Sequence, residues 1–461
     1  MSAAAKKKNP GFFKAVGMNF AEIGTTFAHG DWKTRLSYII LGFGELLRGQ
    51  IAKGIAFLAS EVLFIWYMCQ FGVRYLEKFS TLGTVETTKV HRKTVYGDNS
   101  FLILLYSLLT ICIIVFFIFL WRLNIRENLK EELILKSGKQ LPSNKKVLSS
   151  LLDGNFDKTL LTLPMIGIFL FTVLPIIFMV CIAFTNYDKT HQSPTHLFTW
   201  VGFDNFKELF ATSGAGLGGT FGTVLLWTLL WALAATFIDY FLGLGVAMLI
   251  NKKGIKFKKL WRTILVITIA VPQIVSLLYI SKMFAADGII NQTLLKWGWI
   301  SKAIPFWTNP VLARVMIVVI NIWVGIPYMM LIATGLLMNI PPDLYESASL
   351  DGANHRQMFR YITLPYIMFV TGPFLLTQFT GNLNNFNVIF LLTQGGPQST
   401  KLAGNAGYTD LLITWLYKMT VNDTNYRMAA VIGIMVFIVT AVISLVVYNM
   451  LPSVKDEEAF Q

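Results

Sequence analysis

The chain has 461 residues, of which 54% are hydrophobic and only 14% are charged, and its formal net charge is +14. Soluble domains carry about 25% charged residues, so this composition excludes an ordinary soluble globular protein and indicates an integral membrane protein. The positive charge does not indicate nucleic-acid binding here, because Lys and Arg residues of membrane proteins gather in the loops on the cytoplasmic side.

The amino-terminal stretch "MSAAAKKKNPGFFKAVGMNF" is basic but has no apolar core followed by a small-residue cleavage site. We therefore expect no cleaved signal peptide and predict that residues 1–53 are cytoplasmic. Within them, the apolar run "LSYIILGFGELLRGQ" is interrupted by Gly42, Gly44 and Glu45, which favours an interfacial helix over a membrane span.

Eight apolar stretches are long enough to cross a membrane, which takes about 20 residues. With the amino terminus placed in the cytoplasm, most of the Lys and Arg residues fall in inner segments, including the acid-free loop "NKKGIKFKKLWR", as the positive-inside rule requires. An even number of spans then places both termini in the cytoplasm. The prediction is an all-α integral membrane protein with about eight transmembrane helices, near residues 54–73, 101–121, 160–184, 221–250, 263–283, 311–337, 365–391 and 428–451.

These spans divide the chain into segments. Residues 54–121 hold the first two helices, and residues 159–451 form a core of six helices. Between them, residues 122–158 form a cytoplasmic linker of mixed charge, which we expect to be a solvated helical hairpin. Residues 452–461 form a cytoplasmic tail.

A polar passage, "YESASLDGANHRQMFRYITLP", separates the sixth and seventh spans. Pro341 and Pro342 suit the start of a helix, where backbone N–H groups have no intrahelical partner. Gly352 allows the chain to turn, and Pro365 is expected to open the next span. We therefore predict that residues 341–361 form a helix, a turn and a second helix at the inner membrane surface.

The seventh span is too polar to face lipid, because it contains "QFTGNLNNFNVIF". Asn382 and Asn385 share a helical face, and in the sixth span Asn321, Gly325 and Tyr328 recur at similar spacing. Amides that pair with hydroxyl groups, beside aromatic rings, suit a neutral sugar. The alternative is that these amides form hydrogen bonds between helices.

Two acidic residues lie inside predicted spans, Glu61 and Asp239. An ionisable group at this depth is a candidate proton site. Because neither has a Lys or Arg beside it in the span, we favour a structural hydrogen bond to a neighbouring helix.

The polar passage resembles the EAA motif of ABC importer permeases, E-A-A-x-x-D-G-A followed by F-x-x-I-x-L-P, with one substitution, Ser347 for an alanine. The stretches "NIWVGIPYMM", "NNFNVIFLLTQGGP" and "AGYTDLLITW" narrow the resemblance to permeases of the maltose and maltodextrin type. In that family the motif is the coupling helix that docks into the ATPase subunit. The resemblance thus implies an ABC importer permease fold, with coupling residues Glu346, Ser347, Ala348, Asp351, Gly352 and Ala353.

The same resemblance implies a sugar-binding site. The matching positions are Asn321, Val324, Gly325, Tyr328, Asn382 and Asn385. A further ring-stacking position of the family falls on Gly381, which has no ring, so the length or pose of the ligand is expected to differ.

As a member of this family the chain is expected to be a transport subunit of the bacterial plasma membrane, not an enzyme, with no catalytic residue and no metal site. It contains no phosphate-binding loop, so ATP and Mg²⁺ would be used by a partner subunit, and no cofactor is expected in this chain. The implied partners are a second permease subunit in a heterodimer, a cytoplasmic ATPase dimer, an extracellular sugar-binding protein, an oligosaccharide and membrane lipid, with no nucleic acid. Alternatives are a permease for another oligosaccharide or a proton-coupled secondary sugar transporter.

One departure from the family concerns the segment after the third span. Gram-negative members carry a large folded domain there, whereas "TNYDKTHQSPTHLFTWVGFDNFKELFATSGAGLGGT" is only a loop. We therefore expect no binding-protein contact through such a domain, and a host cell without an outer membrane.

Overall fold

The structure, a computed structural model, describes residues 23–90, 93–150, 152–211, 216–252 and 254–451. The basic amino-terminal patch, Lys253 and the tail 452–461 lie outside the described residues. The chain forms two compact units: unit 1 comprises the residues up to Cys181 together with Thr190–Trp200, and unit 2 comprises Ile182–Lys189 and the residues from Val201 onward.

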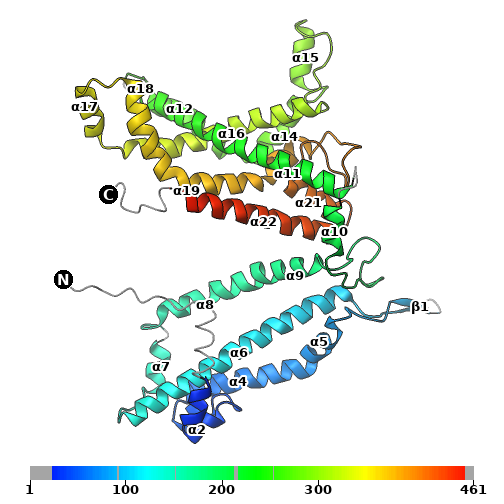
Figure 1. The fold of residues 1–461 in the computed structure, drawn as a ribbon, viewed down its shortest axis with the longest axis vertical. Helices are drawn as coiled ribbons and strands as arrows, with labels where there is room; N and C mark the ends of the chain where they lie inside the picture. The colour runs from blue at the N-terminus through cyan, green and yellow to red at the C-terminus, as the bar shows by residue number, and fades with distance from the viewer. Residues whose placement is uncertain (1–22, 91–92, 151, 212–215, 253, 452–461) are drawn as a thin grey trace. The chain divides into compact units, whose positions relative to one another are not determined.

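Unit 1 consists of long antiparallel helices with a short β-hairpin at one end and small helices at the other (Figure 1). In the hairpin Thr88 pairs with Val95 and Val90 with Lys93. The elements are α2 Trp32–Leu36, α3 Phe43–Leu47, α4 Ile51–Tyr67, α5 Val73–Phe79, β1 Thr88–Val90, β2 Lys93–Val95, α6 Ser100–Lys136, α7 Asn144–Ser150, α8 Phe156–Ile168 and α9 Leu174–Ile182.

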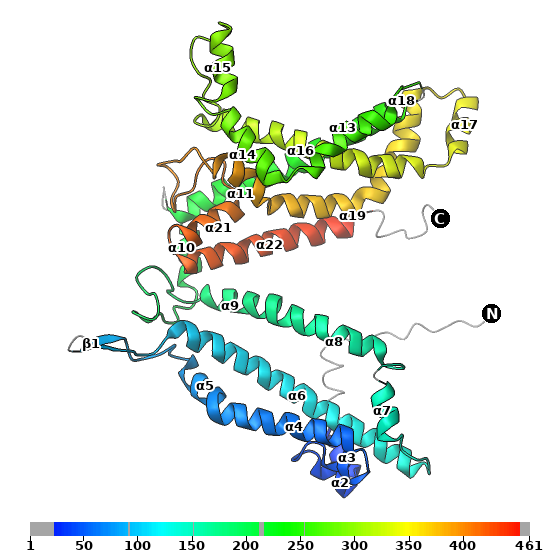
Figure 2. The same cartoon turned by 180° about the vertical axis from the view of Figure 1, so that it is seen from behind.

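Unit 2 is a helical bundle in which α17 and α18 lie at one end and α10, α14 and α21 at the other (Figure 2). Its elements are α10 Asp204–Phe210, α11 Leu217–Leu233, α12 Asp239–Asn251, α13 Lys258–Ala270, α14 Gln273–Met283, α15 Ile289–Lys296, α16 Pro310–Met338, α17 Pro342–Leu350, α18 His355–Met358, α19 Leu364–Leu383, α20 Phe386–Thr393, α21 Leu412–Val421 and α22 Tyr426–Met450. Four π-helical turns join consecutive helices, at Met68–Gly72, Phe169–Val173, Ala234–Ile238 and Phe359–Thr363.

The long packed pair in unit 2 is α12 with α16. Buried apolar side chains of both helices, among them Tyr240, Leu244 and Met330, form one core with Ile367 of α19. A second core surrounds the fully buried Trp231 of α11 and includes Ile317 of α16 and Val388 of α20. These two cores hold α16 between α12 and the α19–α20 region, and so fix the helices that carry the predicted sugar-binding positions.

The predicted membrane spans are confirmed in number. Among the described residues, seven helical segments are long and apolar enough to cross a membrane, and the bent pair α13–α14 brings the number to eight. The fifth span is not straight as a single stretch 263–283 would suggest, because α13 and α14 meet at 91°. Pro272 lies at this bend, where its ring has no N–H to continue the hydrogen-bond ladder of α13.

Pro365 does not open the seventh span, which corrects the sequence prediction. The helix begins ten residues earlier, at His355, after Asn354 caps it through a bond from Gln357 N to Asn354 Oδ1 of 2.9 Å. It runs through the π-helical turn Phe359–Thr363 into α19. The wider π-helical turn relieves the clash that a proline ring otherwise makes with the preceding turn, so the helix continues through Pro365.

The predicted linker 122–158 is solvated only in part. Its first part is the continuation of α6, which stays helical to Lys136, and α7 packs against α4. One face of the α6 extension is buried: Asn124, Ile125, Asn128, Glu131 and Glu132. Sequence charge alone suggested a solvated helix, but the segment before α4 covers this face.

The apolar run 36–50, predicted as one interfacial helix, contains only the last residue of α2 and the whole of α3, joined by a turn. Arg48 fastens it to α6: its guanidinium donates to Asp31 Oδ1 at 2.7 Å, to Thr34 Oγ1 at 2.7 Å and to Asn128 Oδ1 at 2.5 Å. The Arg48 side chain is 1% exposed, so these bonds are desolvated. Hydrogen bonds to α6 therefore help to hold this segment in place, beside the buried Leu41 and the contact of the Tyr38 and Trp121 rings.

Glu45 is buried beside Arg48 and Asn128, and its carboxyl group makes the stability of unit 1 depend on pH. Burial raises the pKa of the Glu45 carboxyl from 4.5 to about 7; the Asn128 amide donates to Oε2 at 2.6 Å and the nearby Arg48 favours the charged form, whereas Glu131 opposes it. Between pH 4.5 and 7 the unfolded chain loses this proton while the folded chain keeps it, so the free energy of unfolding falls as pH rises, by up to about 3 kcal/mol.

We therefore expect Glu45→Gln to raise the apparent Tm of the purified chain in detergent at pH 8 and to flatten its decline between pH 5 and pH 8. Glu86→Gln is the matched control, because Glu86 is exposed. An unchanged pH profile in the Glu45→Gln variant would contradict the assignment of this pH dependence to Glu45.

Candidate functional site

The polar passage forms a projecting helix–turn–helix elbow at one end of unit 2 (Figures 1 and 2). As predicted, α17 begins at Pro342, and Gly352 turns the chain with a φ of +80°. A side chain at that φ is strained, because the left-handed region disfavours residues with a Cβ atom. The elbow is fastened to unit 2 by the hydroxyls of Tyr345 and Thr363, 2.8 Å apart.

The six motif residues lie together on this elbow. Glu346, Ser347, Asp351 and Gly352 are exposed, whereas Ala348 and Ala353 are half-buried, and the backbone N–H of Ala353 donates to the Ala348 carbonyl at 2.9 Å. The side chain of Leu350, between them, is 89% exposed. Leu350 therefore projects from the elbow beside the exposed carboxylates of Glu346 and Asp351.

A break in the helix separates Asn382 from Asn385, the two amides predicted to share one face of the seventh span. α19 ends at Leu383, and Asn385 caps α20 through its Oδ1, 3.3 Å from Val388 N. Asn382 and Asn385 therefore do not lie on one continuous helical face. They remain in contact across the break, because Asn385 Nδ2 donates to Asn382 Oδ1 at 3.3 Å.

Two amides of this region, those of Asn382 and Asn387, also bond to neighbouring segments. Asn382 Nδ2 donates to Thr236 Oγ1 of the α11–α12 junction at 3.0 Å. Two residues beyond Asn385, Asn387 Nδ2 donates to Gln273 Oε1 at the start of α14 at 3.4 Å. Both amides are thus tied to other helices, while Asn382 and Asn385 stay only partly buried.

The predicted positions on α16 divide into two pairs. Asn321 is 6% exposed and its Nδ2 donates to Asp239 Oδ2 of α12 at 2.8 Å. A Cβ atom on Gly325 would lie 2.0 Å from the same Asp239 oxygen, so glycine permits this close approach. Asn321 and Gly325 therefore pack α16 against α12, whereas Val324 and Tyr328 line a cavity.

That cavity lies where α13 bends into α14. Its volume is about 320 Å³, and its wall contains no charged residue: Thr268, Ile269, Ala270, Val271, Pro272, Gln273, Ser276, Trp323, Val324 and Tyr328. The sequence interpretation missed the contribution of α13 and α14. The signal that could have found it is Pro272 in the middle of an apolar run, since broken membrane helices line binding sites.

Gly381 is exposed, and a Cβ atom there would have no neighbour within 4 Å. The structure thus leaves open space at the position where the family resemblance implies a ring.

Both intramembrane acids form hydrogen bonds: Asp239 bonds to a neighbouring helix, as favoured from the sequence, whereas Glu61 bonds to the turn between α2 and α3. Asp239 accepts from Asn321, and Glu61 Oε2 accepts from the backbone N–H of Leu41 at 2.9 Å. Among the described residues, no group of three or more His, Cys, Asp or Glu side chains is placed to hold a metal ion.

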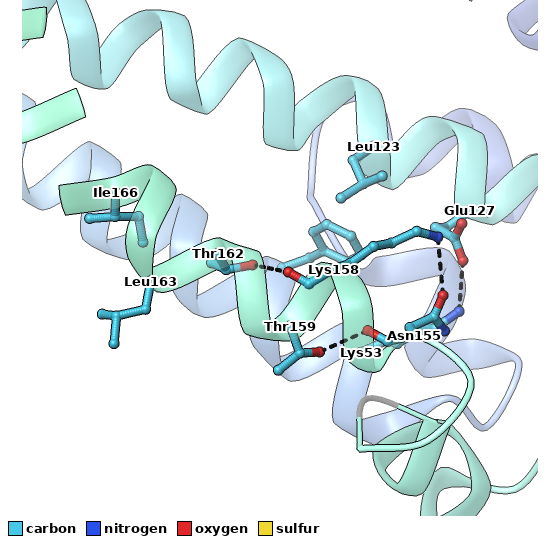
Figure 3. A pocket seen from close by; sticks show the side chains of 10 residues that line it. Lys53, Leu123, Glu127, Asn155, Lys158, Thr159, Thr162, Leu163 and Ile166 are labelled. Atoms are coloured by element: carbon cyan, nitrogen blue, oxygen red, sulfur yellow. Dashed lines mark hydrogen bonds and ion pairs between the residues drawn. The ribbon is translucent and has the colours of Figure 1, made fainter. Parts of the chain in front are cut away.

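Unit 1 contains a larger groove of about 650 Å³ between α4, α6 and α8 (Figure 3). At its polar end Lys53 Nζ donates to Glu127 Oε2 at 2.8 Å, and Lys158 Nζ donates to Asn155 Oδ1 at 3.1 Å. Its other walls are apolar, with Leu163 and Ile166 among them. None of the predicted site residues lines this groove.

Comparison with known proteins places the chain in a family. The family described as binding-protein-dependent transport system inner membrane component matches residues 239–456. The maltodextrin transport permease MdxF of Bacillus subtilis is 33% identical over 441 residues, which cover 92% of this chain and 97% of MdxF. The chain belongs to the binding-protein-dependent transport permeases. It is therefore a multi-pass protein of the plasma membrane and a permease subunit of an ABC importer, a transport component rather than an enzyme.

Other relatives cover the chain to different extents. The galactooligosaccharide permease GanP of Bacillus subtilis is 35% identical over 427 residues, covering 91% of this chain and 97% of GanP. The maltose/maltodextrin permease MalF of Escherichia coli is 32% identical over 265 residues, which span only 51% of that longer protein. A solved alginate ABC importer matches 66% of this chain with a TM-score of 0.52 at 24% identity, which shows the permease fold.

Proposed function

We propose that the chain forms one half of the translocation path of an ATP-driven importer for neutral oligosaccharides of the maltodextrin type. The observation that carries this proposal is the uncharged cavity beside the predicted sugar positions Val324 and Tyr328. Amide and hydroxyl groups beside aromatic rings can pair with sugar hydroxyls and cover the apolar face of a ring. An anionic saccharide would call for a cationic side chain there.

The elbow around α17 is the second part of the proposal. We infer that it faces the cytoplasm and docks onto a separate ATPase subunit, with Glu346, Asp351 and Leu350 at the contact. These side chains are exposed, and the bond between Tyr345 and Thr363 links α17 to the helix that continues into α19. A movement of α17 would therefore reach Asn382 through one helical segment.

The partners follow from this arrangement. A second permease subunit would complete the path beside the exposed Trp323 and Tyr328, an ATPase dimer would bind the elbow and use ATP and Mg²⁺, and an extracellular binding protein would deliver the sugar. Both termini would lie in the cytoplasm. The named relatives support a maltodextrin or a galactooligosaccharide, so the second candidate is an importer of galactooligosaccharides.

Uptake by the copurified complex, reconstituted in vesicles with its binding protein, tests the proposal. We expect labelled maltodextrin to accumulate only when ATP is present on the side of the elbow. Unlabelled galactooligosaccharide should compete only weakly with this uptake. Uptake driven by a proton gradient without ATP would favour secondary transport through Asp239. Preferential uptake of galactooligosaccharide would move the assignment to the second candidate.

A further inference from the structure

The bend between α13 and α14 interrupts the helix at a depth where membrane helices are normally continuous. The two helices meet at 91° near the middle of the segment Lys258–Met283. The N–H groups of Val275 and Ser276 both donate hydrogen bonds to the Pro272 carbonyl, at 3.0 and 3.3 Å. Residues from Thr268 to Gln273 line the cavity at this point.

Such a break is stable only where its polar backbone groups meet protein, water or a ligand. An unpartnered backbone group in hydrocarbon costs several kcal/mol. The cavity wall contains the polar side chains of Thr268, Gln273 and Ser276 among apolar ones, so a space that holds water or a polar solute suits the bend better than lipid does. This bend adjoins Val324 and Tyr328, which line the same space.

Two aromatic residues of α16 open onto this space. Trp323 is 48% exposed and Tyr328 46% exposed, although Trp323 lies in the middle of the 29-residue helix. Tryptophan in membrane proteins is enriched at the interface, where its N–H group meets water. A half-exposed tryptophan at the centre of a span suits a wet cavity, where its ring can cover a sugar face.

Gln273 connects the cavity with the amides of the broken seventh span. It lines the cavity, and its Oε1 accepts from Asn387 Nδ2 at 3.4 Å, while its own amide N–H groups donate to none of the residues that the structure describes. Ser276, one turn further along α14, adds a hydroxyl. Sugar hydroxyls donate and accept, so an amide and a hydroxyl one turn apart can bind them in either direction.

We propose that the α13–α14 bend is an additional saccharide subsite, in which Trp323 stacks on a sugar ring and Gln273 binds its hydroxyls. The inference rests on the proposed function and extends it beyond the positions that the family resemblance implied. A cavity of about 320 Å³ lies at the small end of ligand pockets, so it holds one part of an oligosaccharide. The subsite therefore selects for chain length, and Trp323 supplies an aromatic ring to this cavity, whereas Gly381 has none and does not line it.

The test measures ATP-driven uptake and equilibrium binding of labelled maltose and maltohexaose by the reconstituted complex with Trp323→Leu and Gln273→Leu. We expect each variant to raise KM and Kd for maltohexaose about 3- to 10-fold, as expected for one lost ring contact or hydrogen bond. KM for maltose and kcat for both sugars should stay within about twofold of wild type. Trp323→Phe, which keeps a ring, should restore most of the affinity for maltohexaose.

Trp299→Leu and Gln292→Ala are matched controls, since both residues are exposed in unit 2 and neither lines the cavity. Equal KM changes for maltose and maltohexaose, or none, would overturn the subsite while the proposed function stands. A wild-type complex that neither binds nor transports either sugar would overturn both. A change confined to kcat would assign Trp323 a structural role instead.

Discussion

Replacing Gly352 with valine is expected to reduce ATP-driven uptake by about tenfold or more while the permease still inserts and binds its ligand. The φ of Gly352 is +80°, and in this region a residue with a Cβ atom is strained by about 1–2 kcal/mol, with a β-branched residue affected more. The turn would relax to a different geometry and move α17 relative to α18. Because α18 continues into α19, the ATPase would then close without driving the helix that carries Asn382.

The measurement compares uptake with ATP hydrolysis in the same vesicles: hydrolysis should persist while uptake falls. Gly298→Val is the matched control, because Gly298 has a φ of +74°, has equally open space around a Cβ atom and lies near α15, away from the elbow. It should carry similar strain without loss of coupling. Leu350→Glu, which strains no backbone, should weaken ATPase binding directly, and normal uptake in both elbow variants would contradict the docking role.

The sequence was sufficient for features that depend on local composition. Apolar length located the spans, and the two prolines and Gly352 located the start of α17 and its turn, because each acts through its own backbone. The prediction from helical periodicity failed at Asn384, because it treated the seventh span as one continuous helix. The shared helical face predicted for Asn382 and Asn385 is therefore wrong, although the two side chains are in contact across the helix break, where Asn385 acts as a cap.

Other features depend on residues that are distant in the chain. The bond between Asn321 and Asp239 joins positions 82 residues apart, and the Arg48 cluster joins the amino-terminal segment to α6. No spacing rule predicts such pairs, since they arise from how the helices pack. The bend at Pro272 was visible as a proline in an apolar run, but a proline in a membrane helix is compatible with a mild kink as well as with a 91° break.

The largest loss of substrate recognition is expected from the double variant Asn382→Ala and Asn385→Ala. Each amide can form hydrogen bonds to a sugar hydroxyl worth about 0.5–1.5 kcal/mol, so the loss of both should raise KM roughly 10- to 100-fold. Assembly with the ATPase should be unchanged, because neither residue lies on the elbow. Uptake at several maltodextrin concentrations, with copurification as the measure of assembly, gives both quantities.

Two further variants separate sugar binding from contacts between helices. Thr236→Val removes the interhelical partner of Asn382, whose Nδ2 donates to Thr236 Oγ1 at 3.0 Å, but leaves the amide in place. Asn384→Ala removes a neighbouring exposed amide, whose Nδ2 donates to the Thr380 carbonyl of the same helix at 3.3 Å, and serves as the local control. If Asn382 binds sugar, Thr236→Val should change KM by less than about threefold. If Thr236→Val instead causes the same loss as the double variant, together with a lower Tm, the amides act between helices and the sugar site must lie elsewhere on α16 and the α13–α14 bend.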